Sequence, residues 1–133
     1  MKKRSEQRVL VVDDFSTMRR IIKNLLKENG FIKIEEADDG STAWKLIQSS
    51  QYDFIVSDWN MPIMTGIELL KNVRSRKTGQ RTPFLLVTAE QKRSQILEAA
   101  EAGVDGYIVK PFTGKTLNEK IKKIEERYQK LSL

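Results

Sequence analysis

The sequence contains no cysteine and no histidine. Their absence excludes disulfides, thiolate nucleophiles, imidazole bases and the zinc or copper sites that depend on these ligands. No apolar run approaches the roughly 20 residues of a membrane-spanning helix. The basic N-terminus, MKKRSEQR, lacks the apolar segment of a secretory signal. We therefore expect a cytoplasmic protein without membrane contact, whose chemistry uses carboxylates, hydroxyls and lysine.

The 133 residues match the usual size of one domain, and 39% of them are hydrophobic. We predict one domain over 1–133, with a core at about 8–131 and no output domain. Lys and Arg number 24 against 18 Asp and Glu, giving a net charge of +6. Such a balance can indicate nucleic-acid binding, but the cations are interleaved with glutamates, as on solvated helix faces. Nucleic acid is therefore not the expected partner.

Short apolar runs alternate with helical patterns along the chain. The strand-like runs cover residues 8–12, 32–37, 54–57, 84–88 and 107–109. Apolar residues at helical spacing follow each of them, over 18–26, 43–47, 67–73, 96–100 and 117–131. Strict alternation with short linkers predicts a doubly wound α/β fold, in which right-handed crossovers join five parallel strands and helices cover both faces. The alternating pattern over 32–37 favours an edge strand.

Polar residues stand where four of these strands end, namely Asp13, Asp14, Asp58, Thr88 and Lys110. In open α/β sheets, ligands bind beyond the carboxyl ends of the strands, so these side chains are expected to converge on one crevice. Two carboxylates about 4 Å apart repel by roughly 4 kcal/mol at a typical effective dielectric. Such a cluster requires a cation or a raised pKa.

An all-oxygen ligand set suits Mg²⁺, with Mn²⁺ as an alternative, and Mg²⁺ keeps an open position for a phosphate oxygen. A carboxylate at such a site can act as a nucleophile towards phosphorus and form an aspartyl phosphate. Lys110 would neutralise the phosphoryl group, and the Thr88 hydroxyl would donate to one of its oxygens. The pattern therefore predicts a site that accepts a phosphoryl group.

Each of these residues also has a purely structural interpretation. Asp13 and Asp14 are typical turn or helix-capping residues, Asp58 could initiate a turn, Thr88 could cap a helix, and Lys110 could be a solvated loop lysine. Taken singly, the structural interpretation is favoured for each. Taken together at the carboxyl ends of four strands, they favour a functional site.

Four motifs, VVDDFSTMRR, SDWNMP, VTAE and YIVKPF, closely resemble the receiver domains of bacterial response regulators, above all the receivers of chemotaxis. The resemblance extends from about Val9 to the final helix. It implies the flavodoxin-like strand order 2-1-3-4-5. It also implies that Asp58 is the phosphoacceptor, and that Asp13, Asp14, Asp58 and the backbone carbonyl of Asn60 hold Mg²⁺.

The resemblance assigns further roles. Lys110 pairs with the phosphoryl group, and the Lys110–Pro111 bond is cis. Thr88 and Tyr107 form the switch, although an aromatic residue in a strand is ordinarily a packing residue. Asn60 and Glu90 tune the rate at which the phosphate is lost.

The partners that the resemblance implies are a CheA-type histidine kinase as donor, the flagellar motor switch protein FliM as target and, as a further candidate, a phosphatase. The protein would be a monomer that catalyses only its own phosphorylation and dephosphorylation. We expect Trp59 to be a partly exposed neighbour of the site. Thr65 stands where an acidic or amide residue is common, and it can still cap the following helix.

Two alternative functions remain open. A metal-dependent phosphohydrolase of related architecture also uses an aspartyl nucleophile, but it usually carries a second carboxylate two residues later, where this chain has Asn60. A basic adaptor would bind nucleic acid or an acidic protein without phosphate, and its binding would depend steeply on salt.

Overall fold

The computed structural model describes residues 1–76, 81–90 and 92–131. The predicted domain range of 1–133 therefore ends in two residues that lie outside the described part. A 3-10 turn, η1 (Arg4–Glu6), precedes the first strand. The strands are β1 (Arg8–Val12), β2 (Lys33–Ala37), β3 (Phe54–Asp58), β4 (Phe84–Thr88) and β5 (Gly106–Val109). The helices are α1 (Ser16–Glu28), α2 (Gly40–Ser49), α3 (Gly66–Ser75), α4 (Arg93–Glu101) and α5 (Gly114–Leu131).

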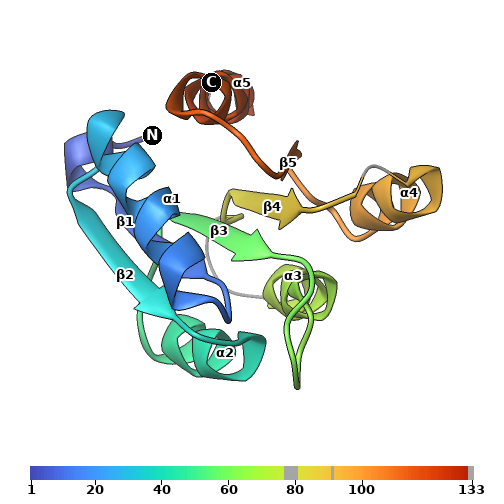
Figure 1. Ribbon diagram of the computed structural model, residues 1–133. Helices are drawn as coiled ribbons and strands as arrows, with labels where there is room; N and C mark the ends of the chain where they lie inside the picture. The colour runs from blue at the N-terminus through green and yellow to red at the C-terminus, as the bar shows by residue number, and fades with distance from the viewer. Residues whose placement is uncertain (77–80, 91, 132–133) are drawn as a thin grey trace.

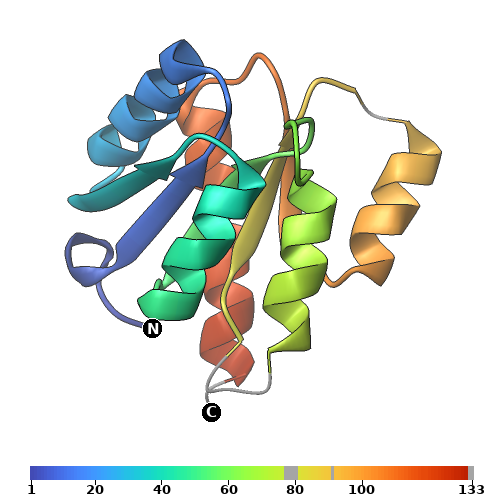
Figure 2. The same cartoon turned by 90° about the horizontal axis from the view of Figure 1, so that it is seen from below.

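All strands are parallel and lie in the order β2-β1-β3-β4-β5. The doubly wound architecture, the strand order and the edge position of β2 are thereby confirmed. Figure 1 shows α1 and α5 on one side of the sheet and α2 and α3 on the other. Because the crossovers are all of the same type, the loops that follow the strands gather at one end of the molecule (Figure 2).

Two hydrophobic clusters hold the layers together. Residues from β1, β3 and β4 pack on Ile22 and Leu26 of α1 and on Leu117, Ile121 and Ile124 of α5. The opposite face of the sheet packs against α2, α3 and Ala99 of α4. The central strands β3 and β4 are buried along their whole length, which explains their nearly continuous apolar sequence.

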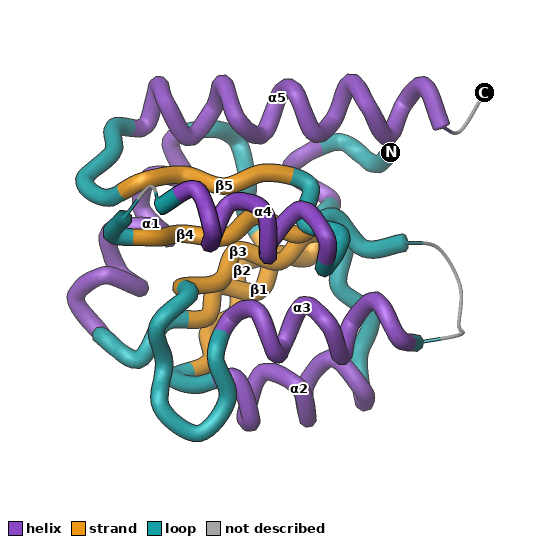
Figure 3. The backbone as a smooth tube through the Cα atoms, turned by 90° about the vertical axis from the view of Figure 1, so that its right-hand side faces the viewer, coloured by secondary structure: helices purple, strands orange, loops and turns teal. Residues whose placement is uncertain are grey.

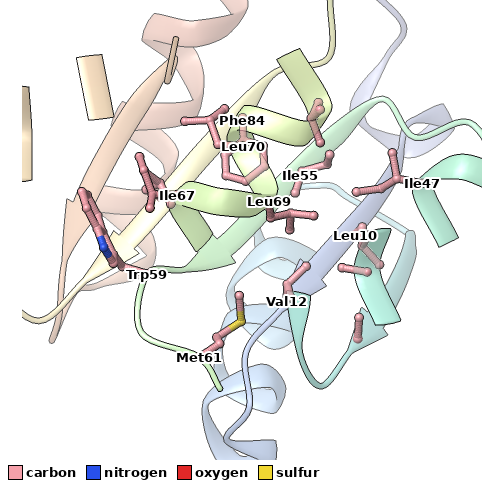
Figure 4. Close-up of a cluster of buried hydrophobic side chains, with 14 of the residues drawn as sticks. Leu10, Val12, Ile47, Ile55, Trp59, Met61, Ile67, Leu69, Leu70 and Phe84 are labelled. Carbon is pink, nitrogen blue, oxygen red and sulfur yellow. The ribbon is translucent and has the colours of Figure 1, made fainter. Parts of the chain in front are cut away.

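The second cluster extends to the edge of the predicted site. Trp59 and Met61 follow β3 and are 8% and 6% exposed. Figure 4 shows the indole of Trp59 alongside Ile67, and the side chain of Met61 near Val12. Trp59 is therefore buried, and the expectation of a partly exposed residue was wrong. Its indole packs in the hydrophobic cluster that includes Ile67 of α3, a contact that the sequence pattern does not reveal.

Candidate functional site

The register of the sheet brings the first and third strands level at their carboxyl ends. Val12 pairs with Ser57, so Asp13 and Asp58 are next to each other on adjacent strands. Neighbouring strands lie about 4.8 Å apart, which brings the two carboxylates within reach of a single ion. Asp14 follows directly in the loop that leads to α1.

The three predicted carboxylates do converge. Asp13, Asp14 and Asp58 each offer a carboxylate oxygen, and these atoms all lie within 4.8 Å of one another. The Lys110 ammonium, from the loop after β5, is 3.0 Å from Asp58 Oδ1 and 3.5 Å from Asp13 Oδ2. One lysine faces three carboxylates, so two negative charges remain uncompensated by it.

One carboxylate oxygen of Asp13 has a structural role, and the other has no hydrogen bond. Its Oδ1 accepts a hydrogen bond of 2.9 Å from the Phe15 amide, the turn that was the structural interpretation of this residue. Its Oδ2 is buried and accepts no hydrogen bond from the described residues, although the Lys110 ammonium is nearby. A buried carboxylate oxygen without a hydrogen bond is rare, because its desolvation is costly. This oxygen and its two carboxylate neighbours form an oxygen-only ligand set that fits Mg²⁺.

Burial and charge act against each other on Asp58. Burial raises the pKa of this carboxyl, and the charges of Asp13 and Asp14 raise it further, while the hydrogen bond and charge of Lys110 lower it. The net result is a raised pKa. The ionised carboxylate is therefore destabilised relative to solution, and a divalent cation in the cluster would stabilise it.

The loop after β3 is anchored to the site by a close backbone approach. A Cβ on Gly66 would lie 2.2 Å from the carbonyl oxygen of Asp58, so only glycine fits here. The Gly66 amide donates to the Trp59 carbonyl at 2.8 Å. Thr65 caps α3 in a reciprocal capping box with Glu68, which confirms its predicted capping role.

Thr88 lies at the end of β4, and its hydroxyl is engaged away from the acidic cluster. Its Oγ1 donates to the Glu90 carbonyl at 3.0 Å and accepts from the Glu90 amide at 3.2 Å. The side chain thus closes a turn and does not cap α4, whose N-cap is Lys92. The Glu90 carboxylate is exposed and pairs with Lys92 at 3.1 Å.

Tyr107 of β5 is half-buried and packs at the margin of the cluster that covers α2 and α3. The Lys120 ammonium of α5 lies 5.2 Å from the centre of its ring, a cation–π contact.

Asn60 is exposed in the loop after β3. The structure therefore joins Asp13, Asp14, Asp58 and Lys110, and it places Thr88, Asn60, Glu90 and Tyr107 around or beyond them. The Lys110–Pro111 bond is cis, as predicted.

The comparisons with known proteins agree with this geometry. The family model for the response regulator receiver domain matches residues 9–122. The chain belongs to the response regulator receiver family. Receiver domains are signalling proteins, and they bind Mg²⁺ at an acidic cluster of the kind found here.

The receiver domain is 61% identical over 120 residues to the chemotaxis protein CheY of Pseudomonas aeruginosa, covering 90% of this chain and 97% of that protein. It is 59% identical to CheY-3 of Vibrio cholerae, with coverage of 90% and 92%. Among solved structures, Vibrio cholerae CheY4 superposes with a TM-score of 0.81 at 36% identity, covering 89% and 98% of the two chains. The Francisella response regulator 1452 receiver domain superposes with a TM-score of 0.81 at 34% identity, covering 92% of this chain and 99% of that chain.

Two notable features were not identified from the sequence. Asp105 is a buried carboxylate at the opposite end of the sheet from Asp13 and Asp58, and its position directly before a strand was the available signal. Ile63 is exposed in the loop after β3 with a positive φ. No local pattern predicts that an isoleucine adopts this conformation.

Within the described part of the chain, no helix is long and apolar enough to cross a membrane.

Proposed function

We propose that this receiver domain accepts a phosphoryl group on Asp58 from a CheA-type histidine kinase and then binds the flagellar motor switch protein FliM. The observation that carries the proposal is the convergence of Asp13, Asp14 and Asp58 with the Lys110 ammonium 3.0 Å from Asp58. The similarity to chemotaxis proteins named CheY supports the kind of kinase and target. We also propose that the protein is cytoplasmic and that it is a monomer.

The proposed transfer uses the chain's own groups at each point. A carboxylate oxygen of Asp58 attacks the phosphorus of a phosphohistidine, and the new O–P bond forms as the N–P bond breaks; the electron pair of the N–P bond goes to the ring nitrogen, which takes a proton from water so that neutral imidazole leaves. Lys110 balances the charge of the phosphoryl oxygens. Asp13, Asp14, Asp58 and the Asn60 carbonyl would hold Mg²⁺, which would supply further charge neutralisation.

The proposed switch begins at Thr88. Its hydroxyl gives up its hydrogen bonds to the Glu90 backbone and donates instead to a phosphoryl oxygen. This change reorders the loop after β4. Tyr107 then turns inward and changes the surface of α4, β5 and α5 that the target recognises. Driving such a switch from mostly off to mostly on requires a differential of about 5.5 kcal/mol, so the target contributes together with the phosphate. Asn60 and Glu90 set the rate of phosphate loss, alone or with a phosphatase.

The acceptor is tested with acetyl phosphate and Mg²⁺, followed by intact mass measurement. The wild type is expected to gain the mass of one phosphoryl group, and Asp58→Asn is expected to gain none. Asp38→Asn, which removes an exposed carboxylate after β2, is the matched control and should react normally. The phosphorylated wild type should then bind a FliM peptide more tightly than the unmodified protein. An adduct that persists in Asp58→Asn contradicts the acceptor assignment, and equal peptide affinities contradict the switch.

The two rival functions are less well supported. Asn60 stands where a phosphohydrolase of this type usually carries its second carboxylate. For a nucleic-acid adaptor, the buried and partly unsatisfied Asp13 would have no purpose. Turnover of an external phosphate ester, or steeply salt-dependent DNA binding, would favour these alternatives.

A further inference from the structure

Ile63 is an outlier of the described backbone. Its φ is +70°, and no other non-glycine residue in the described ranges has a positive φ. A β-branched side chain is disfavoured in the left-handed region because its Cβ crowds the backbone. Glycine, which has no Cβ, would adopt this conformation more readily. The residue present is therefore a poor choice for the local backbone.

No packing within the protein offsets this strain. The Ile63 side chain is 82% exposed, more than any other exposed large hydrophobic in the described part of the chain. The Met64 amide donates to the Pro62 carbonyl at 2.7 Å, which closes a tight turn with Ile63 at its apex. Figures 1 and 3 show that the loop between β3 and α3 projects from the body of the molecule.

The apex is nevertheless held firmly relative to the acceptor. The loop begins at Asp58 and returns at Gly66, whose backbone lies against the Asp58 carbonyl. On its other side, a Cβ on Gly40 would lie 2.6 Å from the Met64 carbonyl, so the start of α2 packs directly on the loop. An exposed apolar side chain thus stands at a fixed position five residues from Asp58.

We propose that Ile63 is a docking residue for the protein phosphodonor, an inference that rests on the proposed function. Its side chain enters an apolar pocket on the phosphohistidine-bearing domain and aligns the phosphorus with Asp58. Lys110 and a bound Mg²⁺ would together balance the three carboxylates, so the site offers the incoming phosphoryl anion no net charge attraction. An apolar contact beside the site supplies association that the local electrostatics does not. Strained residues that the fold itself does not require are typical of functional sites.

The test compares two donors, acetyl phosphate and a phosphorylated CheA-type kinase that phosphorylates the wild type. Ile63→Asn is expected to react with acetyl phosphate within about twofold of the wild-type rate. Its kcat/KM with the kinase should fall about tenfold, the size expected for one buried apolar contact. Its Tm should not fall, because the exposed Ile63 side chain packs on no other part of the protein. Ile63→Met, which keeps an apolar side chain, should recover most of the kinase reaction.

Ile32→Asn is the matched control, because Ile32 is also 67% exposed but precedes the edge strand β2. It should leave both reactions unchanged. A kinase rate for Ile63→Asn equal to that of the wild type overturns the docking role, even if a phosphatase or the motor switch protein binds this variant less well. An equal loss with both donors also overturns it. Failure of the wild type to react with acetyl phosphate would instead contradict the proposed function.

Discussion

Asp58 and Asp105 are both buried aspartates, 6% and 5% exposed, but they lie at opposite ends of the sheet in opposite environments. Asp105 Oδ2 accepts hydrogen bonds from the Arg74 guanidinium and the Phe84 amide at 2.8 Å, and from the Tyr128 hydroxyl at 3.0 Å. Arg81 lies 3.3 Å from the other oxygen. Asp58 shares one lysine with Asp13, and the Asp14 carboxylate lies in the same cluster.

The difference separates a carboxylate with a structural role from the proposed phosphoacceptor. Around Asp105, cations and hydrogen-bond donors more than compensate the charge of one carboxylate. Burial together with the Asp105 charge raises the pKa of Tyr128, so its hydroxyl remains a hydrogen-bond donor. Around Asp58, burial and like charges raise the pKa of this carboxyl itself. The first site is complete without a ligand, whereas the second would gain from a cation.

The largest expected effect is at the structural carboxylate. Asp105→Ala leaves the half-buried Arg74 guanidinium without its counter-ion and the Phe84 amide without its acceptor, and it should lower the free energy of unfolding by about 3 kcal/mol. Urea unfolding at pH 7 in EDTA measures this. Glu36→Ala, which removes exposed pairs with Arg19 and Lys23, should cost less than about 1 kcal/mol. Similar losses in the two variants would contradict the structural role of Asp105.

Mg²⁺ should act at the acceptor end only. At about ten times its dissociation constant, it should stabilise the wild type by about 1.4 kcal/mol. Trp59 fluorescence, isolated in a Trp44→Phe background, should change over the same titration because Trp59 adjoins Asp58. Asp13→Asn should abolish both responses, whereas Asp38→Asn should retain them. A response that survives in Asp13→Asn would place the ion elsewhere.

The smallest effect concerns pH in metal-free protein. Because burial raises the pKa of Asp58, the folded state holds this proton more tightly than the unfolded state does. The stability from this group is therefore present below the ordinary carboxyl pKa and is lost as pH rises through the raised value. Asp58→Asn should thus stabilise the protein at pH 7, by about 1 kcal/mol or less, and the gain should shrink towards pH 4. Thermal unfolding in EDTA between pH 4 and pH 7 tests this, and a destabilised variant at pH 7 contradicts it.

Much of the fold could be predicted because its signals are periodic and local. The buried runs of β3 and β4 and the helical spacing of α1 and α5 predicted both the elements and their alternation. The capping role of Thr65 was also predictable, since a capping box lies within four residues. The burial of Trp59 was not, because it depends on how α3 packs on the sheet.

The site divides in the same way. Carboxylates and a lysine at strand ends were visible in the sequence, since the end of a parallel strand is a position that a pattern can locate. The sequence did not reveal the hydrogen-bond partner of the Thr88 hydroxyl or the contact between Lys120 and Tyr107. Each depends on the directions that side chains take in the folded protein.

The amino-acid sequence by itself determined a doubly wound α/β chain with acidic and basic residues at the carboxyl ends of its strands, because periodicity and strand ends are local properties. Only the tertiary structure decided that Asp13 Oδ2 has no hydrogen bond, that Asp105 is surrounded by arginines, and that Ile63 is exposed and strained. Those outcomes depend on the register of β1 against β3 and on how distant loops pack, which no short segment encodes.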